Sequence, residues 1–142
     1  MAIQTGNTLL QVAFLFYVSS LAGYLLFLVR QKEQIQKISF YLIAIGVGVH
    51  FAAMAASGAA IKSLPVQNLV QNLSMAALAF GVMFLYVRYK FNLKMLGLFT
   101  AMILSVTMLA ALLLPDTQAP PNEALKGIWF YCHIILIFAG DA

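Results

Sequence analysis

Two histidines, His50 and His133, are the residues of this chain best suited to chemistry, because each lies within a long apolar stretch. A titratable imidazole is costly in hydrocarbon, and such residues usually face the interior of a helical bundle and mark a ligand or ion pathway. Neutral imidazole is also a common metal ligand, including the axial ligand of haem iron. The two residues therefore raise the question of whether the chain holds a metal cofactor inside a membrane.

The elements that must position these histidines are predicted from composition. The 142 residues are 63% hydrophobic and 8% charged, whereas soluble proteins are about half apolar and a quarter charged. Apolar runs of about 20 residues identify transmembrane helices. We therefore predict an all-α, polytopic transmembrane helical bundle that forms a single membrane domain over residues 1–142. Complete spans are expected at about 8–29, 38–61, 68–87 and 95–114, with Asn68 as a cap of the third.

A fifth apolar segment covers residues 128–142. At about 1.5 Å per residue it is too short to cross a hydrocarbon core of about 30 Å. We therefore expect an incomplete fifth span, and we expect the chain to be the N-terminal part of a longer protein.

Basic residues predict the orientation of the bundle. Six of the eight lie in the first and third loops, namely Arg30, Lys32, Lys37, Arg88, Lys90 and Lys94. The positive-inside rule then places loops 30–37 and 88–94 in the cytoplasm and the N-terminus outside. Because the net charge of +4 is explained by this asymmetry, no nucleic-acid partner is expected.

Small residues crowd the span that contains His50, which lies near the expected bilayer midplane. They are Gly46, Gly48, Ala52, Ala53, Ala55, Ala56, Ser57, Gly58, Ala59 and Ala60. Such a stretch lets a neighbouring backbone, or a flat ligand, come close. His50 itself is either a haem ligand or a neutral histidine hydrogen-bonded to another helix, and both interpretations remain open.

The second histidine, His133, lies about five residues into the last apolar segment, near its expected outer boundary. The neighbouring Trp129, Phe130 and Tyr131 also fit an aromatic belt at the membrane interface. On helical geometry the depths of His133 and His50 differ by roughly 10 Å. Two separate positions fit these depths more simply than one shared haem.

Other candidate ligands are less specific. A methionine could complete a haem site, and the conceivable ones are Met54, Met75, Met83 and Met102. We expect Cys132 to pack as a small apolar side chain. The role of Asp141, the one carboxylate within an apolar segment, is left open.

Three segments resemble the cytochrome c assembly family, the CcsA and HemX-like haem-handling membrane proteins. The segment 46–50 (GVGVH) is similar to an apolar run that ends in a transmembrane histidine. The segment 64–73 (LPVQNLVQNL) is similar to an outward Pro-x-x-Asn-Leu-aromatic-Glu-Ser segment that leads into a helix. The segment 129–135 (WFYCHII), followed by GDA at 140–142, resembles the region around an outward histidine.

The resemblance implies that the chain binds haem b and delivers it across the bacterial inner (plasma) membrane for c-type cytochrome biogenesis. His50 would be the deep axial ligand of haem iron and His133 an outer one, with no catalytic residue in this chain. The implied enzymatic role is at most that of a component of a holocytochrome c synthase, with the external haem-attachment segment beyond Ala142.

The implied partners are membrane lipid, haem, a second cytochrome c biogenesis membrane protein and apocytochrome c. One alternative is a HemX-like membrane protein that influences haem biosynthesis. The other is a non-haem transporter or structural membrane subunit in which both histidines merely pack.

Overall fold

The computed structural model describes residues 2–61, 66, 68–91, 93–114, 136 and 140, with side chains described from residue 6 onward. Its described part is helical and contains no strand, which confirms the predicted all-α fold. Each of the four helices is long and apolar enough to cross a membrane, as in a multi-pass membrane protein. They are α1 (Ala2–Arg30), α2 (Glu33–Ile61), α3 (Leu69–Phe91) and α4 (Leu96–Leu113). The expected fifth span lies outside the described residues, apart from Leu136 and Gly140.

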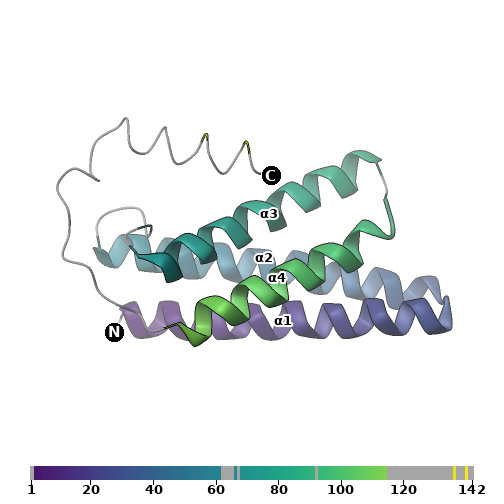
Figure 1. Ribbon diagram of the computed structural model, residues 1–142, viewed down its shortest axis with the longest axis horizontal. Coiled ribbons are helices and arrows are strands. Elements are labelled where there is room, and N and C mark those ends of the chain that lie inside the picture. Colours follow the sequence, from purple (N-terminus) through teal and green to yellow (C-terminus); the bar gives the residue numbers. More distant parts are fainter. Residues whose placement is uncertain are drawn as a thin grey trace.

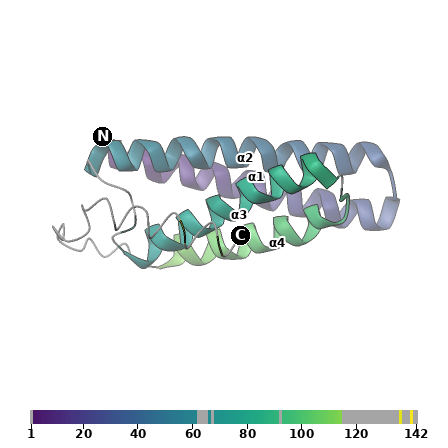
Figure 2. The same ribbon diagram turned by 90° about the horizontal axis from the view of Figure 1, so that it is seen from above.

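The four helices alternate in direction and form two hairpins. Helices α1 and α2 lie side by side along their lengths, and α3 and α4 are inclined against them (Figures 1 and 2). The α1–α2 turn and the α3–α4 turn lie at the same end of the bundle (Figure 1). This arrangement places the first and third predicted loops together, as an up-and-down order of spans requires.

The helices extend further into the polar loops than the apolar runs indicate. Helix α2 begins at Glu33 rather than near residue 38, and α3 continues to Phe91 rather than ending near residue 87. Glu, Gln, Lys and Arg are good helix formers, so a helix continues where the apolar run has ended. The apolar runs therefore do not mark the ends of these helices, which extend beyond residues 38 and 87 into the polar loops.

The turn between α1 and α2 depends on Gln31. Its φ of 52° is left-handed, a conformation common just after the end of a helix. The Gln31 backbone N–H donates to the carbonyl of Phe27 at 2.8 Å, and its side-chain Nε2 donates to the carbonyl of Leu28 at 2.8 Å. These bonds satisfy carbonyls that the helix end would otherwise leave unpaired. The chain can therefore reverse within two residues.

The third helix begins with the predicted cap. The Asn68 side-chain oxygen accepts a hydrogen bond from the Gln71 backbone N–H at 2.8 Å. An N-cap side chain satisfies one of the four amide groups that a helix start leaves without an intrahelical partner. The expected role of Asn68 is confirmed.

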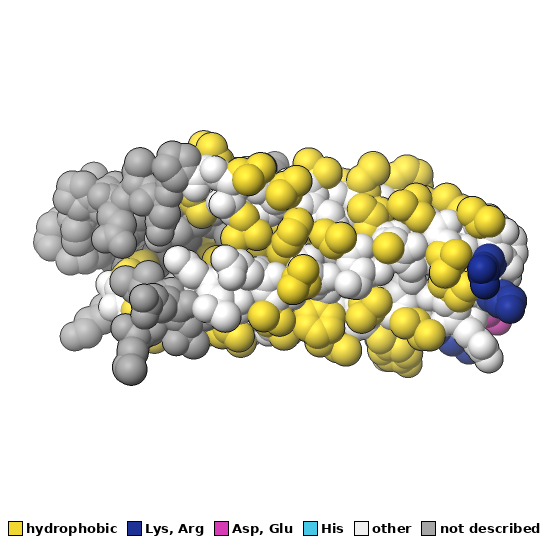
Figure 3. All heavy atoms as spheres, turned by 90° about the horizontal axis from the view of Figure 1, so that it is seen from below, with side chains coloured by type: hydrophobic (Ala, Val, Ile, Leu, Met, Phe, Trp, Pro, Cys, Tyr) yellow, Lys and Arg dark blue, Asp and Glu magenta, His cyan; other side chains and the backbone are white. Residues whose placement is uncertain are grey.

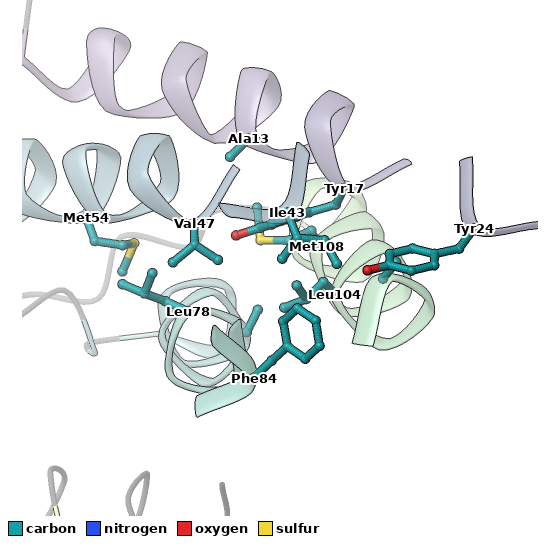
Figure 4. Packing of buried hydrophobic residues seen from close by; sticks show 12 residues of the cluster. Ala13, Tyr17, Tyr24, Ile43, Val47, Met54, Leu78, Phe84, Leu104 and Met108 are labelled. Atoms are coloured by element: carbon teal, nitrogen blue, oxygen red, sulfur yellow. The ribbon is translucent and has the colours of Figure 1, made fainter. Parts of the chain in front are cut away.

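Buried side chains from all four helices form the interior. The largest fully buried ones include Tyr17, Ile43, Leu104 and Met108, which converge between the helices (Figure 4). Hydrophobic side chains also cover much of the outer surface (Figure 3). In a protein whose helices cross a membrane, such a surface faces lipid.

Two glycines allow large side chains to lie directly against a neighbouring helix backbone. A Cβ atom at Gly46 would lie 2.8 Å from the Tyr17 ring, closer than carbon atoms can pack. A Cβ atom at Gly97 would overlap the Tyr24 hydroxyl, which is turned toward α4 (Figure 4). Small residues permit this close approach of helices in membranes.

Candidate functional site

The candidate site is centred on His50, which lies on the inward face of α2. The neighbouring positions Gly46, Val47, Ala53 and Met54 are buried on the same face. His50 has no exposed surface. The bundle therefore encloses this imidazole completely among its helices.

Hydrogen bonds join His50 to side chains on two other helices. The Tyr17 hydroxyl on α1 lies 3.2 Å from Nδ1 of His50. The Ser74 hydroxyl on α3 lies 2.8 Å from Nε2. Ser74 also donates to the sulfur of Met54 at 3.3 Å, which closes the chain of contacts back onto α2. The polar cluster of Tyr17, His50, Ser74 and Met54 thus ties three helices together.

The direction of these bonds defines the tautomer of His50. A methionine sulfur can only accept, so the single Ser74 proton is used in the bond to Met54. The Ser74 oxygen then accepts from Nε2–H, and Nδ1 accepts from the Tyr17 hydroxyl. The opposite arrangement would leave the buried Tyr17 proton without an acceptor in the cluster. Because unpaired polar groups are costly in an apolar interior, the geometry favours a neutral imidazole protonated at Nε2.

The small residues of α2 lie on two different faces. Gly46 and Ala53 face inward, and the Tyr17 ring lies directly over Gly46. Gly48 and Ala52 face outward, with open space around a Cβ position at Gly48. On the inward face, the room left by small side chains is therefore occupied by α1.

The donor chemistry of the cluster fits an axial position of haem. Imidazole nitrogen and methionine sulfur are both axial ligands of haem iron. Ligand histidines are usually held by a hydrogen bond to the other ring nitrogen, and Tyr17 is so placed at Nδ1 of His50. However, Nε2 is already bonded to Ser74. Haem ligation by His50 would therefore require this bond to be exchanged and the helices that enclose the ring to move apart.

Of the four methionines considered as second ligands, only Met54 belongs to the cluster. Met75 is half-buried, whereas Met83 and Met102 are exposed on the outer surface. Met54 therefore contacts the partner of His50, but it lies one helical turn after His50 on the same face of α2, where the two side chains cannot bind iron from opposite sides of a porphyrin.

The remaining candidates, His133, Cys132 and Asp141, lie outside the described residues, as do the aromatic positions 129–131. Within the described part of the chain, no group of three or more His, Cys, Asp or Glu side chains could hold a metal ion. Axial ligation of haem needs only one or two protein donors, so this finding bears on other metal centres rather than on haem.

Tyr17 and Ser74 were not predicted from the sequence. Both are hydrogen-bonding side chains within apolar helices, and this is the signal that points to such partners. The site contains one buried imidazole with a phenol on one nitrogen and an exchangeable hydroxyl on the other. Such an arrangement can hold a proton at a defined nitrogen or offer a ligand to a metal. Comparison of the chain with models of protein families, with curated proteins and with solved structures finds no match.

Proposed function

We propose that this chain binds haem b within the membrane and delivers it toward the outer face for c-type cytochrome biogenesis, as a component of a haem export or cytochrome c synthase system. The observation that carries the proposal is the complete burial of His50 near the middle of a membrane-spanning helix. An ionisable residue at such a position is rarely kept without a ligand or transport role. The resemblance of three segments to the cytochrome c assembly family supports the same function.

In this proposal Nε2 of His50 would hold the haem iron. The ring proton would then lie at Nδ1, where the Tyr17 oxygen, 3.2 Å away, would accept it, and the Tyr17 hydroxyl proton would need an acceptor outside the cluster. Ser74 would then lose its bond to Nε2 and could keep its bond to the sulfur of Met54. Bound haem would supply the iron centre and its redox chemistry, and the chain supplies ligation and orientation.

His133 is proposed as an outer ligand. The proposed site of action is the bacterial plasma membrane, with loops 30–37 and 88–94 on the cytoplasmic side. The crowding of Lys and Arg at the end with the two hairpin turns (Figure 3) supports this orientation through the positive-inside rule.

The test is a ligand-rescue experiment on protein purified from haem-replete cells. We expect the full chain to show a Soret absorption band and His50→Gly to lose it. Added imidazole should restore the band, because it fills the space left by the side chain and offers the same donor. Pyrrole, a ring of similar size without a ligating nitrogen, serves as the control. Colourless wild-type protein that takes up no added haem would refute the proposal.

A second function is favoured by one specific observation, that both ring nitrogens of His50 are already hydrogen-bonded. Here the chain is a non-haem transporter or structural membrane subunit, and His50 joins α1, α2 and α3. This function predicts that His50→Gly lowers the stability of the bundle while the absorption spectrum of the protein never contains a haem band.

In a HemX-like role the chain would bind haem but would take no part in the attachment of haem to apocytochrome c. A cell-based reporter separates it from the first proposal. Loss of the gene product would abolish covalent haem attachment in a reporter cytochrome c if the chain serves assembly. It would instead change the cellular haem level, with attachment intact, if the chain acts on haem biosynthesis.

A further inference from the structure

A dense group of cations lies at the end of the bundle that carries the two hairpin turns (Figure 3). Five of its six members are exposed and one, Arg88, is partly buried. They are Arg30, Lys32, Lys37, Arg88, Lys90 and Lys94, and we call them the basic end. These residues lie at one end of the bundle because both hairpins reverse direction there.

Little negative charge balances the basic end. Glu33 is the one carboxylate in the described part of the chain, and it forms a 2.7 Å ion pair with Lys94. Both side chains are largely exposed, so this pair contributes little to stability. Arg30 and Lys32 have no carboxylate partner among the described residues. The basic end therefore presents an excess of positive charge.

The turn geometry presents part of this charge in an ordered way. Gln31, held by its two bonds to the end of α1, separates Arg30 from Lys32 in a two-residue turn. Lys37 lies one helical turn after Glu33, at the start of α2. These three cations stand on the backbone of a single short hairpin tip, and a backbone already held in a turn loses less conformational entropy on binding than a mobile loop does.

Exposed aromatic side chains accompany the cations on α3. Tyr89 is 91% exposed, and the Lys90 ammonium lies 5.8 Å from the ring centre of Tyr86 and 5.6 Å from that of Phe91. Tyrosine is enriched where a membrane meets water, because its ring is apolar and its hydroxyl is polar. This end of the bundle thus carries the aromatic and basic residues that are typical of the membrane–water interface.

We propose that Arg30, Lys32 and Lys37, together with Lys90, bind the phosphate groups of anionic phospholipids. The ends of membrane-spanning helices lie beside lipid headgroups, so a phosphate is already at the required level. Cations near an anionic membrane surface each contribute roughly a five-fold increase in affinity. The site is separate from His50 and does not depend on haem binding.

The test uses the full chain in micelles and native mass spectrometry to measure bound lipid. Phosphatidylglycerol and phosphatidylcholine with identical acyl chains are compared. We expect preferential retention of phosphatidylglycerol, and a loss of about 25-fold in its affinity in the double variant Lys32→Gln/Lys37→Gln. The matched control, Lys62→Gln/Lys126→Gln, removes the same charge from the sequence between α2 and α3 and from the sequence after α4, and should retain wild-type affinity.

Three outcomes overturn the proposal. Equal binding of the two lipids would show that headgroup charge is not recognised. Equal losses in the two double variants would show an effect of net charge alone. Displacement of the lipid by inorganic phosphate at the same concentration would identify a free anion as the ligand. Circular dichroism of each variant verifies that the helices remain folded.

Discussion

Replacement of Tyr17 by phenylalanine removes one oxygen atom from the polar cluster and little else. The phenylalanine ring retains the contact over Gly46 and the edge-on contact with the His50 ring, whose centre lies 6.0 Å from that of Tyr17. What is lost is the 3.2 Å hydrogen bond to Nδ1. The substitution therefore isolates the polar contribution of Tyr17 to the packing of α1 against α2.

The expected loss is about 1 kcal/mol in the free energy of unfolding. Hydrogen bonds between membrane helices contribute on average about 0.6 kcal/mol, and at most about 1.7 kcal/mol. The 3.2 Å distance places this bond toward the weaker half of that range. The Nδ1 acceptor that remains unpaired in a fully buried ring brings the expected loss to the lower end of the about 1–3 kcal/mol that a stranded polar group costs.

The assay is unfolding by dodecyl sulfate in mixed micelles, followed by far-ultraviolet circular dichroism. A double-mutant cycle combines Tyr17→Phe with His50→Leu, which removes both partners of the bond. We expect a coupling energy of about 1 kcal/mol, because once one partner of the bond has been removed, removing the other costs little further free energy of unfolding. Tyr41→Phe is the matched control, since Tyr41 is 62% exposed on the same helix as His50.

Two results would refute this reasoning. Tyr17→Phe could destabilise the bundle equally in the presence and absence of His50, which would assign the effect to something other than their bond. Alternatively, Tyr17→Phe could be as harmless as Tyr41→Phe. The bond to Nδ1 would then make no contribution to stability.

Three further predictions concern packing, protonation and haem. Gly97→Ala should destabilise the bundle by about 1–3 kcal/mol, because the added Cβ overlaps Tyr24. Gly48→Ala places its Cβ in open space and should stabilise α2 by up to about 1 kcal/mol. Thermal unfolding of the two variants compares these effects. Nitrogen-15 solid-state NMR of the haem-free chain should show His50 protonated at Nε2 alone, and a proton on Nδ1 would contradict the assigned bond directions. His133→Ala should deplete an outer haem population more than a deep one in absorption spectra, and equal loss of both would indicate one shared haem.

The spans were predictable because length and apolarity are properties of a contiguous stretch. The Asn68 cap was predictable for a similar reason, since its partner Gln71 lies three residues away. The ends at Glu33 and Phe91 were not, because apolarity marks the membrane core and not the limits of a helix. Local patterns thus describe each helix well except at its polar ends.

The partners of His50 illustrate what a local pattern does not contain. Tyr17 and Ser74 lie 33 and 24 residues from His50 in the chain. Their convergence depends on how α1 and α3 are rotated about their axes, and many serines and tyrosines in apolar helices would look the same in sequence. The sequence could identify the imidazole as costly in lipid, but not which side chains relieve that cost.

The polar cluster also bears on how the chain enters the membrane during synthesis. Tyr17 and Ser74, the hydrogen-bond partners of His50 among the described residues, lie within the first 74 residues. Because synthesis runs from the N-terminus, these partners are all available once α3 has been inserted, before α4 follows. Both ring nitrogens of His50 can therefore be hydrogen-bonded before α4 joins the assembly.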